Sequence, residues 1–104
     1  MATWIVQAHY VRGEHTKLFK AARAFFLAMG YTKADFDGDE ILLEAGQNSI
    51  LPKHGIDVLQ MLASIKLQKN DRAGAVALEL MAKRFYTTMN GLPNGYKTIN
   101  VGLS

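Results

Sequence analysis

The residues best suited to acid–base or metal chemistry are histidines close to a carboxylate near the start of the chain. His9 and His15 lie on either side of Glu14 in the sequence. If the chain turns there, the three side chains could meet as an acid–base or metal constellation. However, no histidine belongs to an HExxH-type motif or has ligand spacing on one helix. A small metal-dependent or acid–base hydrolase is therefore the least favoured of three functions, and each histidine is expected to be an ordinary, partly exposed side chain.

A second group of carboxylates lies in the run Asp35-Phe36-Asp37-Gly38-Asp39-Glu40. Oxygen ligands at alternate positions could hold Ca²⁺ or Mg²⁺. The run does not match an EF-hand loop, because its glycine comes too early and Gly46 stands where the last carboxylate ligand belongs. Asp-Gly is instead favoured in two-residue hairpin turns, whose backbone needs positive φ. We expect a solvated turn here, with no metal and no cofactor.

Sequence motifs for covalent or nucleotide chemistry are missing. The chain has no cysteine, so it has neither a thiolate nucleophile nor a thiolate metal site. Ser49 and Ser64 lack the Gly-x-Ser-x-Gly surroundings of a nucleophile elbow. Neither GxGxxG nor GxxxxGK[ST] occurs, so no phosphate-binding loop is predicted. These observations favour a non-enzymatic function.

Basic residues form two groups that could bind nucleic acid. Residues 1–52 carry five basic and six acidic side chains, a net charge of −1, whereas residues 53–104 carry seven basic and three acidic ones, a net charge of +4. Each neutralised phosphate would favour binding through counterion release. The first group lies mainly on the outer face of the first predicted helix, and the second spans the junction of the next two. The candidate basic surface is Arg12, Lys17, Lys20 and Arg23 together with Lys66, Lys69 and Arg72. A nucleic-acid-binding accessory protein is the second hypothesis, although charged outer helix faces are common.

An excess of apolar helix surface supports the first hypothesis, a protein-interaction module. The predicted helix from Arg72 to Met89 is apolar on most of its circumference, and such a helix is either central to its domain or covered by a partner. A small chain has limited interior volume, so the surplus would be buried in a homodimer or against another protein. The candidate apolar anchors are Leu27, Met81, Phe85 and Tyr86. An accessory, adaptor or inhibitor protein would use such anchors with basic residues beside them.

These residues must be positioned by a small mixed fold. Alternation from Thr3 to Val11 predicts a strand, and Asp37-Gly38 predicts a hairpin turn. Helical periodicity and end signals predict three helices. The predicted order is strand 3–11, helix 14–29, hairpin strands 31–36 and 40–45, helix 55–69, helix 72–89 and strand 97–103. The fold class expected is α+β, a two-layer sandwich of three helices on a small, mostly antiparallel sheet of three to four strands.

Length and composition agree with one soluble domain over residues 1–104. The chain has 104 residues, 49% hydrophobic residues and a net charge of +3, which argues against two domains and against global disorder. No apolar run is long enough to span a membrane. The N-terminus lacks the regions of a secretory signal, so a cytoplasmic location is expected.

Overall fold

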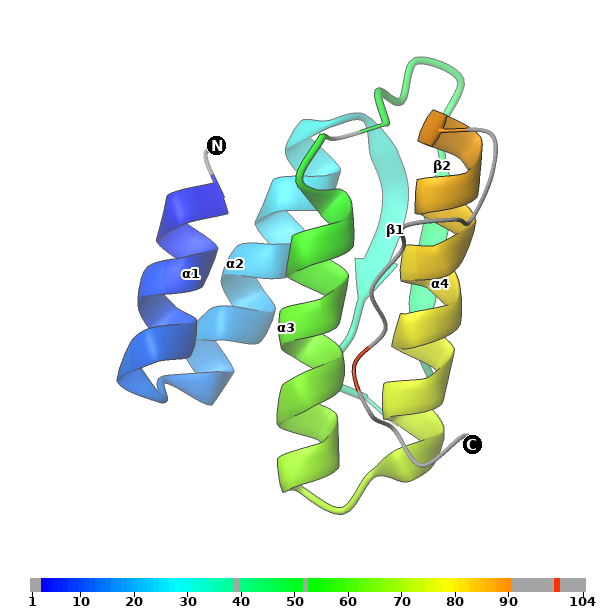
Figure 1. Ribbon diagram of the computed structural model, residues 1–104. Helices are drawn as coiled ribbons and strands as arrows, with labels where there is room; N and C mark the ends of the chain where they lie inside the picture. The colour runs from blue at the N-terminus through cyan, green and yellow to red at the C-terminus, as the bar shows by residue number, and fades with distance from the viewer. Residues whose placement is uncertain (1–2, 39, 52, 91–98, 100–104) are drawn as a thin grey trace.

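The computed structural model describes residues 3–38, 40–51, 53–90 and 99, and within them the chain is an α+β domain (Figure 1). The elements are α1 (Thr3–Arg12), α2 (His15–Ala28), β1 (Tyr31–Asp35), β2 (Leu42–Ala45), α3 (Gly55–Gln68) and α4 (Arg72–Asn90). The α3 and α4 helices form the most extensive helix pair, α2 packs on β1, and α1 lies at the edge of the molecule beside α2 and α3. None of the helices among the described residues is long and apolar enough to cross a membrane.

The first element corrects the sequence prediction, because residues 3–12 form a helix and not a strand. Val6 and Tyr10 share a face in both conformations, since four residues separate positions on one side of a helix and an even number separates positions on one side of a strand. A short apolar segment is therefore ambiguous from periodicity alone. In the structure Val6 is fully buried while Gln7 and Val11 are exposed, a pattern that fits the helix.

The sheet is smaller than expected. The antiparallel hairpin is confirmed: β1 pairs with β2, with Ala34 opposite Leu43 and Asp35 opposite Leu42. The predicted two-residue turn at Asp37-Gly38 is wrong, because residues 36–41 all lie between the last paired positions and Gly38 does not adopt a positive φ. The described residues hold two strands and four helices, in place of the predicted three or four strands and three helices. The predicted strand 97–103 lies outside the described residues except for Ile99, which belongs to no helix or strand.

Two helix ends are closed by the same backbone motif. After α1, the Gly13 amide donates to the Tyr10 carbonyl at 3.2 Å and the Glu14 amide donates to the His9 carbonyl at 3.0 Å. This is the Schellman pattern, and it requires the left-handed conformation that Gly13 adopts at φ 71°. After α3, Asn70 fills the same role at φ 62°. Both turns reverse the chain sharply, so α2 runs back along α1 and α4 back along α3 (Figure 1).

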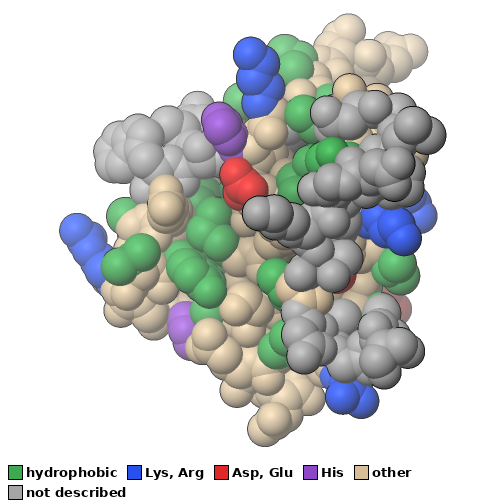
Figure 2. All heavy atoms as spheres, in the orientation of Figure 1, with side chains coloured by type: hydrophobic (Ala, Val, Ile, Leu, Met, Phe, Trp, Pro, Cys, Tyr) green, Lys and Arg blue, Asp and Glu red, His purple; other side chains and the backbone are tan. Residues whose placement is uncertain are grey.

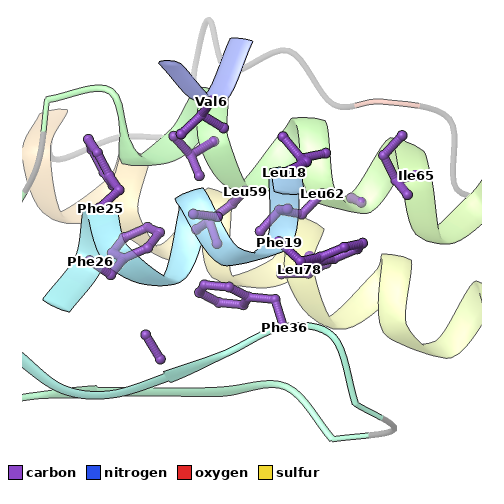
Figure 3. Packing of buried hydrophobic residues seen from close by; sticks show 14 of the residues in the cluster. Val6, Leu18, Phe19, Phe25, Phe26, Phe36, Leu59, Leu62, Ile65 and Leu78 are labelled. Atoms are coloured by element: carbon purple, nitrogen blue, oxygen red, sulfur yellow. The ribbon is translucent and has the colours of Figure 1, made fainter. Parts of the chain in front are cut away.

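The core is centred on Phe26 of α2. Its buried ring makes edge-on or tilted contacts with four other aromatic rings, at centroid separations of 5.2 to 6.0 Å. The rings are those of Phe25, Tyr31, Phe36 and Phe85. Aliphatic side chains from α2, α3 and α4 pack beside them, including Leu18, Leu59, Leu62 and Leu78 (Figure 3). Among the α1 side chains that the structure describes, Val6 alone is fully buried, and the half-buried Tyr10 also packs against the core.

Candidate functional site

A hollow lies between α1 and α3 among the described residues, and we call it the α1–α3 groove. It has a volume of about 570 Å³, within the range of about 300–1,000 Å³ usual for ligand sites. Figure 2 shows hydrophobic side chains at the surface between these two helices, below a histidine and an acidic side chain. The described lining residues are Gln7, Tyr10, Val11, His54, Asp57, Gln60, Met61, Ser64 and Ile99.

One face of α3 forms a long wall of the groove. His54, Asp57, Met61 and Ser64 recur every three or four residues, the spacing that aligns side chains on one side of a helix. Ten residues separate the first from the last, so the wall is about 15 Å long at 1.5 Å per residue. The opposite face of α3 is buried in the core through residues such as Leu62. Its polar face is therefore the one available for binding.

A side-chain hydrogen bond joins the two walls of the groove. The Tyr10 hydroxyl and the Ser64 hydroxyl are 3.1 Å apart. Near the start of α3, His54 Nδ1 lies 3.8 Å from a carboxylate oxygen of Asp57, and both side chains are largely exposed. Val11 is 77% exposed at the α1 side. The groove thus combines apolar surface with a few hydrogen-bonding groups, the usual make-up of a binding site.

Sequence reasoning missed this groove because it assigned residues 3–11 to a strand. A helix there turns Tyr10 toward Ser64 of α3, 54 positions later in the chain. The available signal was the four-residue spacing of Val6 and Tyr10, which fits a helical face as well as a strand face.

The predicted apolar anchors lie on two helices and serve partly in the chain's own core. The Phe85 ring packs 6.0 Å from that of Phe26 and is half-buried, and Met81 also packs against the core. Tyr86 is half-buried, and Leu27 on α2 is 36% exposed. The α4 helix is therefore covered on one side by its own core, as expected for a helix apolar around most of its circumference.

The histidine and carboxylate near the start of the chain do meet, at the turn between α1 and α2. His9 Nδ1 is 3.1 Å from Glu14 Oε1, and Lys17 donates to Glu14 Oε2 at 3.2 Å. These two hydrogen bonds lower the pKa of Glu14 below its usual 4.5, with His9 the larger cause. His15 begins α2, and its side chain has no hydrogen bond or ion pair within the described part of the chain.

The acidic run lies apart from these histidines, in the β1–β2 turn. Asp35 Oδ1 accepts a hydrogen bond from the Asp37 amide at 3.2 Å, an Asx-type contact that favours the turn itself. No three His, Asp or Glu side chains among residues 3–38, 40–51, 53–90 and 99 come together as a group that could hold a metal ion. His9, Glu14 and the turn therefore form no shared metal site within those ranges.

Part of the predicted basic surface converges on Phe19 of α2. Lys66 Nζ lies 5.3 Å and Lys69 Nζ 5.1 Å from the centroid of that ring, within cation–π range. Lys66 is 5% exposed, donates to the Gly38 carbonyl at 3.2 Å and lies 3.6 Å from Asp71 Oδ2. It therefore ties α3 to the hairpin turn and to the start of α4, and offers little charge to a ligand.

The other predicted cations are exposed but lie among carboxylates. Arg12 Nη1 is 3.9 Å from Glu14 Oε1, the acid that Lys17 also contacts. Lys20 and Arg23 line a smaller hollow of about 240 Å³. Its other lining residues are Phe19, Asp35, Phe36 and Asp37. Arg72 is exposed at the start of α4. The two predicted groups thus approach each other at Phe19, with negative charge interspersed between them.

Comparison with known proteins adds no family to these observations. The chain matches no protein-family model, and no curated protein or solved structure is significantly similar to it.

Proposed function

We propose that this protein is a small, non-enzymatic interaction module that binds a partner protein in the α1–α3 groove. The observation that carries the proposal is the apolar surface that the groove leaves accessible, at the exposed Val11 on one wall and the half-buried Met61 on the other, beside the hydrogen-bonding groups of Tyr10 and Ser64. Exposed apolar surface around a concave site marks an interaction surface more often than isolated exposed residues do.

The groove is a better candidate than the outer face of α4. Met81 and Phe85 of α4 are partly used by the core, whereas Val11 is 77% exposed and lines a hollow. Burying the exposed part of a valine side chain contributes about 1–2 kcal/mol. Replacing it with a polar residue should therefore weaken binding by about fivefold or more.

The proposal is tested by placing a photo-crosslinking amino acid at Val11 or at Leu80 in the full chain, within the cells that produce it. Leu80 is the matched control, because it is 53% exposed on α4 and does not line the groove. We expect protein adducts at position 11 that survive nuclease treatment and are lost on competition with the uncrosslinked chain, and none at position 80. An adduct of the chain with itself identifies the partner as a second copy. Equal adducts at both positions, or none at position 11, contradict the proposal.

A nucleic-acid-binding function is the second candidate, supported by the approach of Lys20 and Lys69 to the same ring, Phe19. It ranks lower because Asp35 and Asp37 share the hollow with Lys20 and would repel phosphates. It predicts measurable binding of single- or double-stranded nucleic acid at about 50 mM salt, falling steeply as salt rises. Absence of binding at that low salt contradicts it.

A further inference from the structure

The charge and shape of the α1–α3 groove narrow the class of partner. Apart from His54, just before α3, and Ile99, which belongs to no helix or strand, the described lining residues lie on α1 and α3. These two helical walls offer no row of free backbone amides and carbonyls with which an extended peptide could pair. An extended occupant would leave many of its own backbone groups without partners, whereas a helix satisfies them internally. The wall of about 15 Å is as long as about three helical turns.

The charge at the groove is negative, although the chain as a whole is basic. Lysine and arginine number 12 in a chain of net charge +3, yet neither type occurs among the described lining residues. Asp57 carries the carboxylate of that lining, and it is largely exposed near the start of α3. Lys53 and Arg12 lie nearby in sequence, but neither lines the groove, and Arg12 lies 3.9 Å from Glu14.

From these two observations we infer that the groove takes an amphipathic helix of a partner protein, with a lysine or arginine beside its apolar face that pairs with Asp57. The apolar side chains of that helix pack on Val11 and Met61, and the basic residue lies toward the His54 end. This inference rests on the proposed function and names the class of partner that the site recognises. Because Asp57 is exposed, an ion pair with it contributes little to affinity. We expect it to favour a basic helix over an otherwise identical acidic one by about two- to fivefold.

The probes are two synthetic helical peptides of about 18 residues, long enough to hold a helix. They share one leucine face and differ in carrying either lysine or glutamate at its borders. Binding to the full chain is measured by fluorescence anisotropy, and the contact surface by changes in amide chemical shifts. We expect the lysine peptide to bind about two- to fivefold more tightly than the glutamate peptide at about 50 mM salt, with less preference at about 500 mM.

Four variants assign the effect to the groove. Asp57→Asn should abolish the preference for the lysine peptide, while Asp37→Asn, which removes an exposed carboxylate in the β1–β2 turn, should retain it. Val11→Gln should weaken both peptides, and Leu80→Gln neither. Equal binding of the two peptides, or a preference that survives Asp57→Asn, overturns the charge assignment and leaves the proposed function standing. Failure of both peptides to bind, with protein adducts still formed at position 11, overturns the helical occupant alone. Failure of both peptides and of crosslinking overturns the proposed function too.

Discussion

Replacing Gly74 with alanine should destabilise this protein, against the usual preference of helices for alanine. Gly74 lies in the first turn of α4, where its amide donates to Asp71 Oδ1 at 2.9 Å. This bond makes Asp71 the N-cap of α4. A Cβ at position 74 would lie 2.5 Å from Asp71 Oδ2 and 3.0 Å from its Cγ. The carboxylate must therefore move away to admit the methyl group.

The loss of stability in Gly74→Ala can be estimated from the interactions that the Asp71 carboxylate makes. Losing an N-cap costs about 1 kcal/mol. Asp71 Oδ2 also lies 3.6 Å from Lys66 Nζ, and the aspartate side chain is 37% exposed, so losing that ion pair adds about 0.5–1 kcal/mol after allowance for solvent screening. Alanine recovers up to about 1 kcal/mol through helix propensity. We expect Gly74→Ala to lower the free energy of unfolding by about 0.5–1 kcal/mol.

The effect of Gly74→Ala on stability should change from destabilising to stabilising when the Asp71 carboxylate is removed. In an Asp71→Ala background there is no carboxylate to displace, so Gly74→Ala should raise the free energy of unfolding by up to about 1 kcal/mol. Urea denaturation of the parent, the two single variants and the double variant, followed by circular dichroism, gives the coupling energy between positions 71 and 74. Ala73→Gly is the control for propensity in the same turn, and should be destabilising in both backgrounds. The reasoning is refuted if Gly74→Ala stabilises the parent protein, or if its effect is the same in both backgrounds within about 0.3 kcal/mol.

Three further predictions concern α1 and the core. The pKa of Glu14 is lowered from 4.5, chiefly by its hydrogen bond with His9. The ionised Glu14 should therefore stabilise the fold fully above pH 4.5, and this stabilisation should disappear as the pH falls through the lowered pKa. The urea midpoints of the parent and Glu14→Gln should then converge in acid, and a difference that does not change with pH would contradict the prediction. Tyr10→Phe and Ser64→Ala should each lower the free energy of unfolding by about 1 kcal/mol. The double variant should lose little more than either single variant, because both substitutions remove the same hydrogen bond. Additive losses in urea denaturation would show that the two hydroxyls do not share a bond. Phe26→Ala should cost about 3–5 kcal/mol by opening a cavity among the packed rings, and a loss below about 1 kcal/mol in thermal or urea unfolding would contradict its central place in the core.

The proposed binding surface takes one of its walls from α1. Val6 is the one fully buried side chain among those described on that helix, and Tyr10 adds the bond to Ser64. Partner binding that engages both walls should protect the α1 amides from hydrogen exchange relative to the free chain.

Much of the fold was predictable because its signals are local. The α2, α3 and α4 helices begin and end within two residues of the predicted ranges 14–29, 55–69 and 72–89. Their apolar residues repeat with the helical period, and glycine or Asn-Asp breaks mark their ends. The presence of a hairpin was predictable from two strand-like segments around an Asp-Gly signal, but the geometry of its turn was not. The strands pair only up to Asp35 and Leu42, so residues 36–41 form a longer connection, and Gly38 lacks the positive φ of the two-residue turn.

The candidate site was predictable only in part. The sequence raised the possibility that His9 and His15 meet near Glu14, with ordinary, partly exposed histidines as the favoured alternative. In the structure His9 contacts Glu14 across the turn between α1 and α2, and no hydrogen bond between the two histidines is found among the described residues. Phe85 was expected to face a partner, but its ring packs against Phe26. Lys66 was expected on the surface, but it is 5% exposed. A helical pattern predicts which residues share a face, but it does not determine whether that face packs against the chain's own core, a partner or solvent.

Local sequence signals therefore account for α2, α3 and α4, whose faces and ends depend on neighbouring residues, and for the position of the hairpin, but not for the geometry of its turn. The tertiary structure decided that residues 3–12 are helical, that Tyr10 meets Ser64 across 54 positions, and that a groove lies between α1 and α3. The physical reason is that backbone periodicity and turn geometry act over a few residues, whereas the conformation of a short ambiguous segment is settled by what it packs against, which lies far away in the chain.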